Sequence, residues 1–179
     1  MSRDAYRYAP YYCEENIWHL CQEDEFRRFQ RKVMIISNER RSCPLWNQRA
    51  CIAPGEPVFW DYHVAMLFEN EGWQVYDLDT LLSTPTPMVQ YLESTFAGAD
   101  LPAQFRPIFR LIDADEFVSV FSSDRSHMKD GDGNWLVAPP PWRPIIRNQR
   151  SNLMDLIDMQ TTSFGQTMDL AQLEAAFGY

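Results

Sequence analysis

Cys13 is the first residue of the chain that could carry out chemistry. It lies in the stretch YCEEN, at the start of a predicted helix and directly before Glu14 and Glu15. The N-terminus of a helix offers free backbone N–H groups and a positive dipole end, and both favour the reactive thiolate. The two carboxylates oppose a thiolate, so the position also fits a buried cysteine that only packs. Cys13 is therefore a candidate nucleophile that requires a base.

The other three cysteines carry weaker signals. Cys21 falls on the apolar stripe of the same predicted helix and is expected in the core, while Cys43 and Cys51 lie in a proline-containing loop without a partner motif. No CxxC pair occurs, and the three histidines are not close to the cysteines in a ligand pattern. We expect neither a structural zinc site nor disulfides, and thiols that stay reduced.

His63 is the strongest candidate for the base. It lies in the middle of a predicted strand, in FWDYHVAML, where the alternative is a core histidine satisfied by a backbone carbonyl. A base oriented by a third group is the arrangement of nucleophile, base and orienter found in catalytic triads. His127, in the polar loop SDRSHMKD, and His19, on the first helix, are expected at the surface.

A hairpin next to His63 could supply the third group. The residues NEG separate two predicted strands, and a three-residue turn ending in Gly suits a hairpin whose Gly is left-handed. In that register Glu69 faces Trp73, His63 faces Asp79, and Asp77 lies diagonal to His63. All three polar residues then share one face of the sheet, within reach of a His–carboxylate hydrogen bond. The residues alone leave Asp77 and Asp79 as alternatives.

The remaining pattern predicts the elements that position these residues. Helices are predicted over residues 13–31, 88–96, 114–121 and, weakly, 169–177; strands are predicted over 32–38, 57–69, 72–80 and 109–112, with a short one around 45–46. A helix followed by several strands in sequence predicts an α+β fold, with helices packed on a mostly antiparallel sheet. The stretch DGDGN resembles the start of a calcium loop, but Pro141 occupies the twelfth position, where a glutamate is needed.

Composition limits the classes of function. The chain has 179 residues, enough for a single domain over 1–179, in which the polar segment 148–179 is the least defined part. A net charge of −9 argues against binding of nucleic acid or of an anionic membrane. The absence of a long apolar run or of a signal-peptide core predicts a location in the cytoplasm or also the nucleus. No nucleotide-binding fingerprint is present.

Five stretches together resemble one known family. YCEENIW, ISNERR, WDYHV, YDLDT and SDRSHMKDGDGNW…PPPW occur in the order found in the protein N-terminal glutamine amidohydrolase family, which is also described by its WDYHV motif. The likeness runs from about Tyr8 to Trp142. It implies an α/β fold related to papain-like and transglutaminase-like cysteine enzymes. It also implies a Cys–His–Asp triad, which maps onto Cys13, His63 and, as the first aspartate of YDLDT, Asp77.

The resemblance implies hydrolysis of an N-terminal glutamine to glutamate, with release of ammonia, through a thioester and without metal or cofactor. In the family this is a step of the N-degron pathway. The expected partners are proteins or peptides with a free N-terminal Gln, and we expect a monomer. The substrate's α-ammonium needs an acidic or carbonyl partner. The candidate substrate contacts are Glu14, Glu15, Asp61, Asp79 and Asp124, with Trp60 and Tyr62 as possible pocket walls.

Two other classes of function fit the same residues. A cysteine protease or a transglutaminase-like acyl transferase would use the same triad, but would cleave peptides or incorporate amines. A non-catalytic reader of N-terminal residues would keep the fold and bind without turnover. Ammonia release without peptide cleavage would separate these alternatives.

Overall fold

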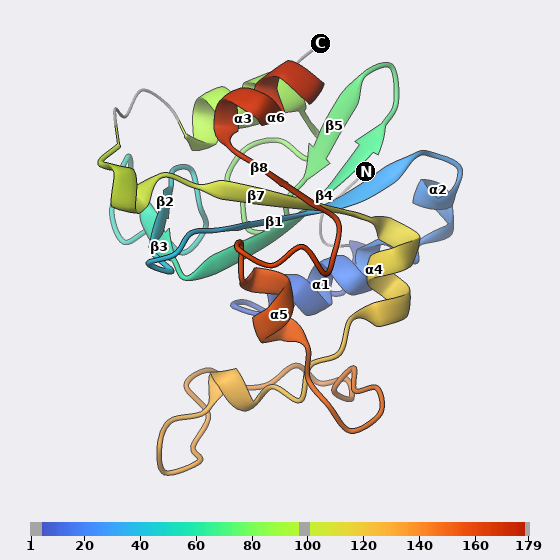
Figure 1. The fold of residues 1–179 in the computed structure, drawn as a ribbon, viewed down its shortest axis with the longest axis vertical. Helices are drawn as coiled ribbons and strands as arrows, with labels where there is room; N and C mark the ends of the chain where they lie inside the picture. Colours follow the sequence, from blue (N-terminus) through green and yellow to red (C-terminus); the bar gives the residue numbers. More distant parts are fainter. Residues whose placement is uncertain (1–4, 97–100, 178–179) are drawn as a thin grey trace.

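A six-stranded antiparallel sheet forms the centre of the protein (Figure 1). The computed structural model describes residues 5–96 and 101–177. The strand order is β6-β5-β4-β1-β7-β8, and every neighbouring pair is antiparallel. The strands are β1 (Arg31–Ser37), β4 (Tyr62–Glu69), β5 (Trp73–Tyr76), β6 (Thr86–Pro87), β7 (Ile108–Asp113) and β8 (Gln166–Met168), and a separate two-stranded sheet joins β2 (Cys43–Leu45) to β3 (Val58–Trp60). The predicted α+β class is confirmed.

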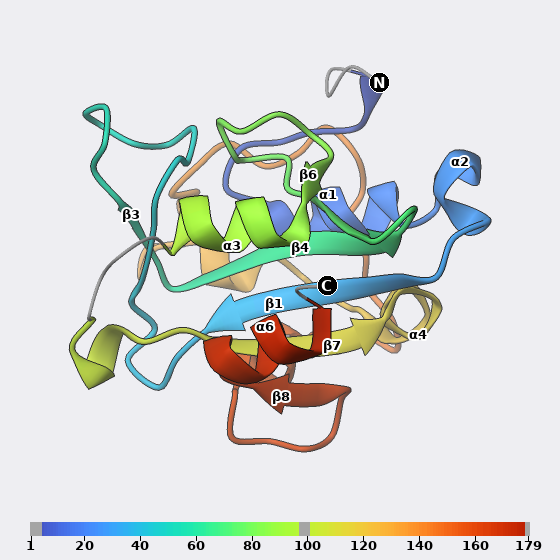
Figure 2. The ribbon, with the colours of Figure 1, turned by 90° about the horizontal axis from the view of Figure 1, so that it is seen from above.

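Helices cover both faces of the large sheet (Figures 1 and 2). α1, α4 and α5 pack on one face, and α3 and α6 on the other. The helices are α1 (Cys13–Leu20), α2 (Asp24–Arg27), α3 (Met88–Thr95), α4 (Ala114–Val120), α5 (Leu153–Ile157) and α6 (Leu170–Phe177). Short 3-10 turns span Ala103–Phe105 and Ser126–Met128. Among the described residues, no helix has the length and apolar character needed to cross a membrane.

The central strand β1 explains the two-sided core. Its sequence RKVMIIS contains four consecutive apolar residues, Val33 to Ile36, as expected for a strand covered on both faces. Val33 and Ile35 belong to the core under α1, α4 and α5, while Met34 and Ile36 belong to the core under α3 and α6. Because side chains alternate along a strand, each face receives its own apolar set.

Several predicted boundaries were wrong. The long first helix ends at Leu20, and Arg31 belongs to β1. The strand predicted over 57–69 is two strands separated at Asp61, and the strand predicted over 72–80 ends at Tyr76. The predicted hairpin is confirmed: Glu69 pairs with Trp73 and the intervening Gly72 has a φ of +107°. However, Asp77 and Asp79 lie beyond the paired part of β5.

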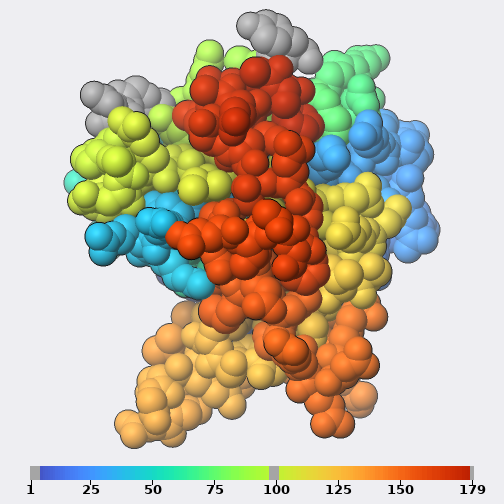
Figure 3. All heavy atoms as spheres, in the orientation of Figure 1, coloured from blue at the N-terminus to red at the C-terminus, as the bar shows by residue number. Residues whose placement is uncertain are grey.

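Arg110 attaches the C-terminal segment to the sheet. The sequence predicted little structure in this segment. This β7 residue is fully buried, and its guanidinium donates to four backbone carbonyls of the segment: Leu156 at 2.9 Å, Asp158 at 2.5 Å, Thr161 at 2.9 Å, and Phe164. Carbonyls therefore take the place of a carboxylate as the acceptors of this buried guanidinium. The segment occupies the middle of the face shown in Figure 3, and β8 pairs with β7 at the edge of the sheet, so α5 and β8, which were not predicted from the sequence, belong to the same fold.

A buried ion pair holds the long loop 122–147 against α1. Arg125 Nε and Nη2 donate to Glu15 Oε1 and Oε2, both at 2.7 Å, and Trp142 Nε1 donates to Glu15 Oε2 at 2.6 Å. Glu15 is fully buried and Arg125 is nearly so. The bidentate pairing of a carboxylate with a guanidinium fixes both partners in one geometry. The tip of the loop projects away from the sheet (Figure 1).

Candidate active site

The sheet has a gap beside the first half of β4. β4 pairs with β1 along its whole length, but with β5 only from Met66 to Glu69. The edge from Tyr62 to Ala65 therefore lacks a strand partner on the β5 side. After Tyr76 the chain leaves β5 and brings YDLDT into this gap. The gap is where a strand histidine can meet groups that are not part of the sheet.

His63 and Asp77 form a buried pair at this gap. His63 Nε2 lies 3.0 Å from Asp77 Oδ1, and both side chains are fully buried. Asp77 Oδ1 also accepts the Asp79 backbone N–H at 2.8 Å, and Asp77 Oδ2 accepts the Tyr91 hydroxyl at 2.9 Å. The Gln48 amide is at 3.4 Å from the same Oδ2. These donors fix the carboxylate, and the carboxylate in turn fixes the imidazole.

The charges of the pair stabilise each other against burial. Burial lowers the pKa of His63, but the charge and hydrogen bond of Asp77 outweigh this and raise it above its ordinary value. Burial raises the pKa of Asp77, but His63 and the surrounding donors outweigh this and lower it. Trp60 stacks on the imidazole at 5.5 Å between ring centroids. His63 Nδ1 has no hydrogen-bond partner among the described residues, so it is free to accept a proton.

Cys13 approaches β4 beside this histidine. It is the first residue of α1, which packs on β4, and its side chain is buried with 5% exposure. The Val64 backbone lies close enough to Cys13 to lower the pKa of its thiol. Val64 directly follows His63 in the strand, which places the thiol next to the histidine position. Burial and the charge of Glu14 raise the pKa of Cys13 well above its ordinary value, so the thiol is neutral without a base.

Cys21 and the remaining cysteines have no such surroundings. Cys21 lies in the core at 1% exposure, as predicted, and burial raises its pKa to about 12. Cys43 is buried in β2, where burial likewise raises its pKa to about 12. Cys51 is partly exposed, and all four thiols are free. Cys13 alone combines a helix start, a backbone N–H and a neighbouring histidine.

Glu14 lies beside the sulfur, in a second network. Its Oε2 is 3.8 Å from Cys13 Sγ and accepts the Tyr62 hydroxyl at 3.0 Å. The same hydroxyl lies 3.2 Å from His127 Nε2, so the expectation of a solvated surface His127 was wrong. The loop 122–147, held by the Glu15–Arg125 pair, brings this histidine to the site.

The structure separates the acidic residues that sequence analysis grouped together. Both oxygens of Glu15 are engaged by Arg125 and Trp142, so this carboxylate is not free for a ligand. Asp61 and Asp124 are exposed, and each accepts a nearby backbone N–H. Asp79 is 4% exposed and accepts the Tyr8 hydroxyl at 2.6 Å.

A cavity of about 290 Å³ opens beside His63. Asp79 and Trp60 form part of its wall, and both lie close to the imidazole of His63. An oxygen of Asp79 is within 4.8 Å of a His63 nitrogen, and the Trp60 ring stacks on the imidazole. Its other lining residues are Tyr8, Pro10, Tyr11, Arg49 and Ala50. The pocket therefore has one acidic and one basic group beside its aromatic walls, and the carboxylate of Asp79 suits a small cationic group on an apolar stem.

His63, Asp77 and Asp79 also have the donor types of a metal site, with their ligand atoms within 4.8 Å of one another. Hydrogen bonds already engage at least one ligand atom of each residue. His63 Nε2 pairs with Asp77, and Asp79 accepts the Tyr8 hydroxyl. The three residues therefore fit an orienting network better than a set of free ligands.

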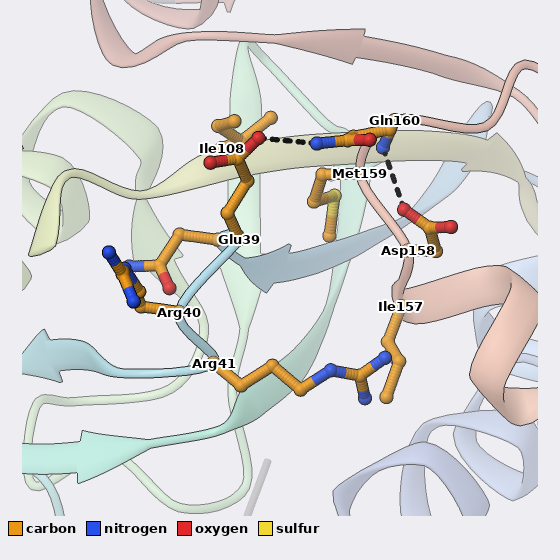
Figure 4. Close-up of a pocket in the computed structure, with 9 residues that line it drawn as sticks. Glu39, Arg40, Arg41, Ile108, Ile157, Asp158, Met159 and Gln160 are labelled. Carbon is orange, nitrogen blue, oxygen red and sulfur yellow. Dashed lines mark hydrogen bonds between the residues drawn. The ribbon is translucent and has the colours of Figure 1, made fainter. Parts of the chain in front are cut away.

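A second pocket, of about 560 Å³, lies elsewhere on the protein (Figure 4). It is lined by Asn38, Glu39, Arg40, Arg41, Ile108, Ile157, Asp158, Met159 and Gln160. Acidic and basic side chains share its walls, and Glu39 accepts a hydrogen bond from Gln160. None of the residues of the His63–Asp77 site lines it.

Comparison with known proteins gives one consistent result. A profile described as N-terminal glutamine amidase matches residues 8–177. A human protein named protein N-terminal glutamine amidohydrolase is 43% identical, with 98% of this chain and 90% of the human chain covered. Proteins of the same name from Bos taurus and Arabidopsis thaliana are 46% and 34% identical, covering 88% and 98% of this chain and 79% and 86% of their own. This chain belongs to the N-terminal glutamine amidase family.

Proposed function

We propose that this protein hydrolyses the side-chain amide of an N-terminal glutamine to glutamate, using Cys13, His63 and Asp77 as a triad. The observation that supports this most directly is the buried His63–Asp77 pair, whose Nδ1 has no hydrogen-bond partner among the described residues and whose strand neighbour Val64 lies next to Cys13. The names of the relatives supply the substrate: proteins whose first residue is glutamine.

In the acylation step, the Cys13 thiol gives its proton to His63 Nδ1, and the thiolate attacks the amide carbon. Asp77 stabilises the imidazolium that forms. The oxyanion of the tetrahedral intermediate needs donors, and the Cys13 backbone N–H, free at the helix start, is one of them. His63 then returns the proton to the departing nitrogen, the C–N bond breaks, and ammonia leaves behind a thioester on Cys13.

In the deacylation step, water attacks the thioester and gives a proton to the same histidine. The carbon–sulfur bond breaks, the thiol is restored by the proton on His63, and the glutamate product carries the new oxygen. No group outside the chain and the water is needed. The arrangement of a helix-start cysteine, a strand histidine and an aspartate after the next strand is the reason we also propose a papain-like or transglutaminase-like architecture.

We place the substrate's α-ammonium in the cavity beside His63, with Asp79 as its acceptor. Asp79 has one oxygen held by Tyr8 and lines the cavity, whereas Glu15 is fully engaged and Asp61 and Asp124 are exposed. A cation that loses part of its hydration needs such a carboxylate. The product has an acidic N-terminal residue, and its further use in the N-degron pathway, in the cytoplasm or nucleus, follows from the family resemblance alone.

The test is mass spectrometry of a Gln-starting peptide with the wild-type protein and two variants. Wild type is expected to add about one dalton as amide becomes acid and to release one ammonia for each peptide converted. Cys13→Ala should abolish both signals, because no other thiol lies beside His63. Cys21→Ala should retain turnover within a small factor and lose stability, because it removes a core side chain.

Three outcomes would contradict the proposal. Peptide cleavage or amine incorporation in place of ammonia release would assign the site to a protease or an acyl transferase. Binding without turnover would make the protein a reader of N-terminal residues. Equal loss of activity in folded Cys13→Ala and Cys21→Ala would remove Cys13 from the mechanism.

A further inference from the structure

A buried carboxylate lies next to the nucleophile and is not part of the triad. Glu14 is 1% exposed, although burial of a carboxylate without a cation is costly. Its Oε2 is bonded by Tyr62 and lies 3.8 Å from Cys13 Sγ, but Oε1 has no hydrogen-bond partner among the residues that the structure describes. The nearest cationic candidate, His127 Nε2, is 3.6 Å from Oε1, too far for a hydrogen bond.

Glu14 is close enough to His63 for its charge to help raise the pKa of that imidazole, but the imidazole makes its hydrogen bond to Asp77 and leaves Glu14 Oε1 open. Cys13, Glu15 and Tyr62 are neutral or anionic groups, and burial lowers the pKa of His127, so this imidazole is uncharged at neutral pH. Burial raises the pKa of Glu14 to about 7, its own backbone N–H opposes this, and the charge of Glu15 adds to it. An open acceptor therefore remains in the core, at the position where the reacting amide must come.

The substrate has the donor that fits this acceptor. When the amide carbon lies against the Cys13 sulfur, its oxygen and its –NH2 must point in different directions. The oxygen becomes negatively charged during attack and cannot face Glu14, so it must turn to backbone N–H groups. The –NH2 group is then directed to the carboxylate, because it is only about 1.3 Å from the attacked carbon, the length of an amide C–N bond.

We propose that Glu14 determines specificity for glutamine over glutamate, by accepting the side-chain –NH2 of the substrate and repelling the carboxylate of the product. This deepens the proposed function and rests on it. The substrate gains a hydrogen bond to a charged group, while the product places a second negative charge at the same buried position. One residue thus recognises the amide and promotes release of the acid.

The experiment measures binding, so that it does not depend on turnover. Cys13→Ala supplies an inactive background, and isothermal titration calorimetry at pH 8 compares two peptides that differ only in Gln or Glu at the first position. In this background the Gln peptide should bind roughly 10- to 100-fold more tightly, the range of a hydrogen bond to a charged group. In Cys13→Ala with Glu14→Gln, the Gln peptide should weaken and the Glu peptide should tighten, bringing the ratio to about one or below.

Two further variants separate this role from a structural one. Glu14→Asp keeps the charge and should keep the rejection of the Glu peptide, even if the Gln peptide weakens. Glu69→Gln removes an exposed carboxylate from the far end of β4 and should leave both affinities unchanged. Circular dichroism and thermal melting of each variant establish that it is folded.

The outcomes that overturn the proposal are distinct. An unchanged Gln-to-Glu ratio in Glu14→Gln would show that Glu14 faces neither group. An equal weakening of both peptides would show that Glu14 holds the α-ammonium or only supports the fold. A Cys13→Ala background without preference for Gln, or without binding, also refutes it. Failure of the proposed function would instead appear as wild-type protein that binds the Gln peptide selectively but releases no ammonia.

Discussion

His63 Nε2 and Asp77 Oδ1 lie 3.0 Å apart although no strand pairing connects their backbones. β5 ends one residue before Asp77, and the following turn, closed by the Asp79 N–H on Asp77 Oδ1 at 2.8 Å, sets the carboxylate. Asp77 therefore acts on the imidazole, while the Asp79 side chain lines the cavity. Two aspartates separated by one residue should thus have different kinetic effects.

Asp77→Asn should reduce kcat by roughly 10³-fold or more with little change in KM, because an amide neither fixes the tautomer nor stabilises the imidazolium. Asp79→Asn should raise KM by roughly 10-fold and leave kcat within a few-fold, because it removes the proposed ammonium acceptor but leaves its backbone N–H in place. Steady-state ammonia release over a range of peptide concentrations measures both constants. If Asp79→Asn lost the larger part of kcat, the assignment of the orienting aspartate would be wrong.

Glu14→Gln should stabilise the protein at high pH. The pKa of Glu14 is raised from 4.5 to about 7, chiefly by burial, so the folded state binds this proton more tightly than the unfolded state. The loss of unfolding free energy caused by ionised Glu14 is absent below pH 4.5 and grows as the pH rises from 4.5 to 7. Above pH 7 it is complete, and the difference between the two pKa values corresponds to about 3 kcal/mol. An uncharged amide removes this cost.

Urea unfolding of wild type and Glu14→Gln at pH 5 and pH 8 checks the sign. The variant's gain in free energy of unfolding should be larger at pH 8 than at pH 5. A gain that is constant with pH would mean that Glu14 does not titrate in this range. If Glu14 serves the activity at the expense of stability, Glu14→Gln should lose activity and gain stability at pH 8.

Breaking the Glu15–Arg125 pair should be strongly destabilising. Glu15→Gln leaves the Arg125 guanidinium buried and without its bidentate carboxylate, which should cost roughly 3–5 kcal/mol of unfolding free energy. Asp24→Asn is the matched control, since Asp24 pairs with Arg27 at the surface, where such pairs contribute about 1 kcal/mol or less. If urea unfolding gave the same loss of unfolding free energy in both variants, the Glu15–Arg125 pair would not be what holds the loop 122–147 against α1.

Periodicity predicted part of the fold closely. Alternation and apolar runs located β1, α3 and α4 to within one residue at each end, and the glycine of the NEG turn gave the pairing of Glu69 with Trp73 that the structure has. The helix that begins at Cys13 was predicted too long, and the strand that carries His63 was predicted to begin too early. The break at Asp61 was missed because aromatic residues with high strand propensity lie on both sides of it in FWDYHV. Propensity cannot detect a strand that changes sheets.

The surroundings of the site depend on contacts that are distant in sequence. Tyr91 supports Asp77 from α3, and His127 reaches Tyr62 across 65 positions. The signal for His127 was present only as a polar loop, which is usually solvated. Arg110 lies in the middle of an apolar strand, which indicates a buried cation that needs hydrogen-bond acceptors. The carbonyls that accept from it belong to a segment whose sequence shows no periodicity, so they could not be predicted.

Selectivity for the first residue is the last prediction, and it follows from a pocket with two fixed ends. In the proposed binding mode the α-ammonium is held at Asp79 and the amide carbon must reach the Cys13 sulfur. Asparagine is one methylene shorter, so its amide carbon stops about 1 Å or more from the attack position. A displacement of that size can cost about 10²-fold in rate, more than the contact energy of the lost methylene. Acetylation removes the charge and leaves the carboxylate unpaired.

Four peptides that differ only at the N-terminus test this geometry. They begin with Gln, Asn, acetyl-Gln and Gly-Gln, and the rest of the sequence is the same. Ammonia release should be fast for Gln, about 10²-fold slower for Asn, and undetectable for acetyl-Gln and Gly-Gln. Asp79→Asn should narrow the difference between Gln and acetyl-Gln, because it removes the group that distinguishes an ammonium from an amide. Equal rates for Gln and acetyl-Gln in wild type would exclude recognition of a free N-terminus, and the cavity beside His63 would then hold the side chain of an internal glutamine.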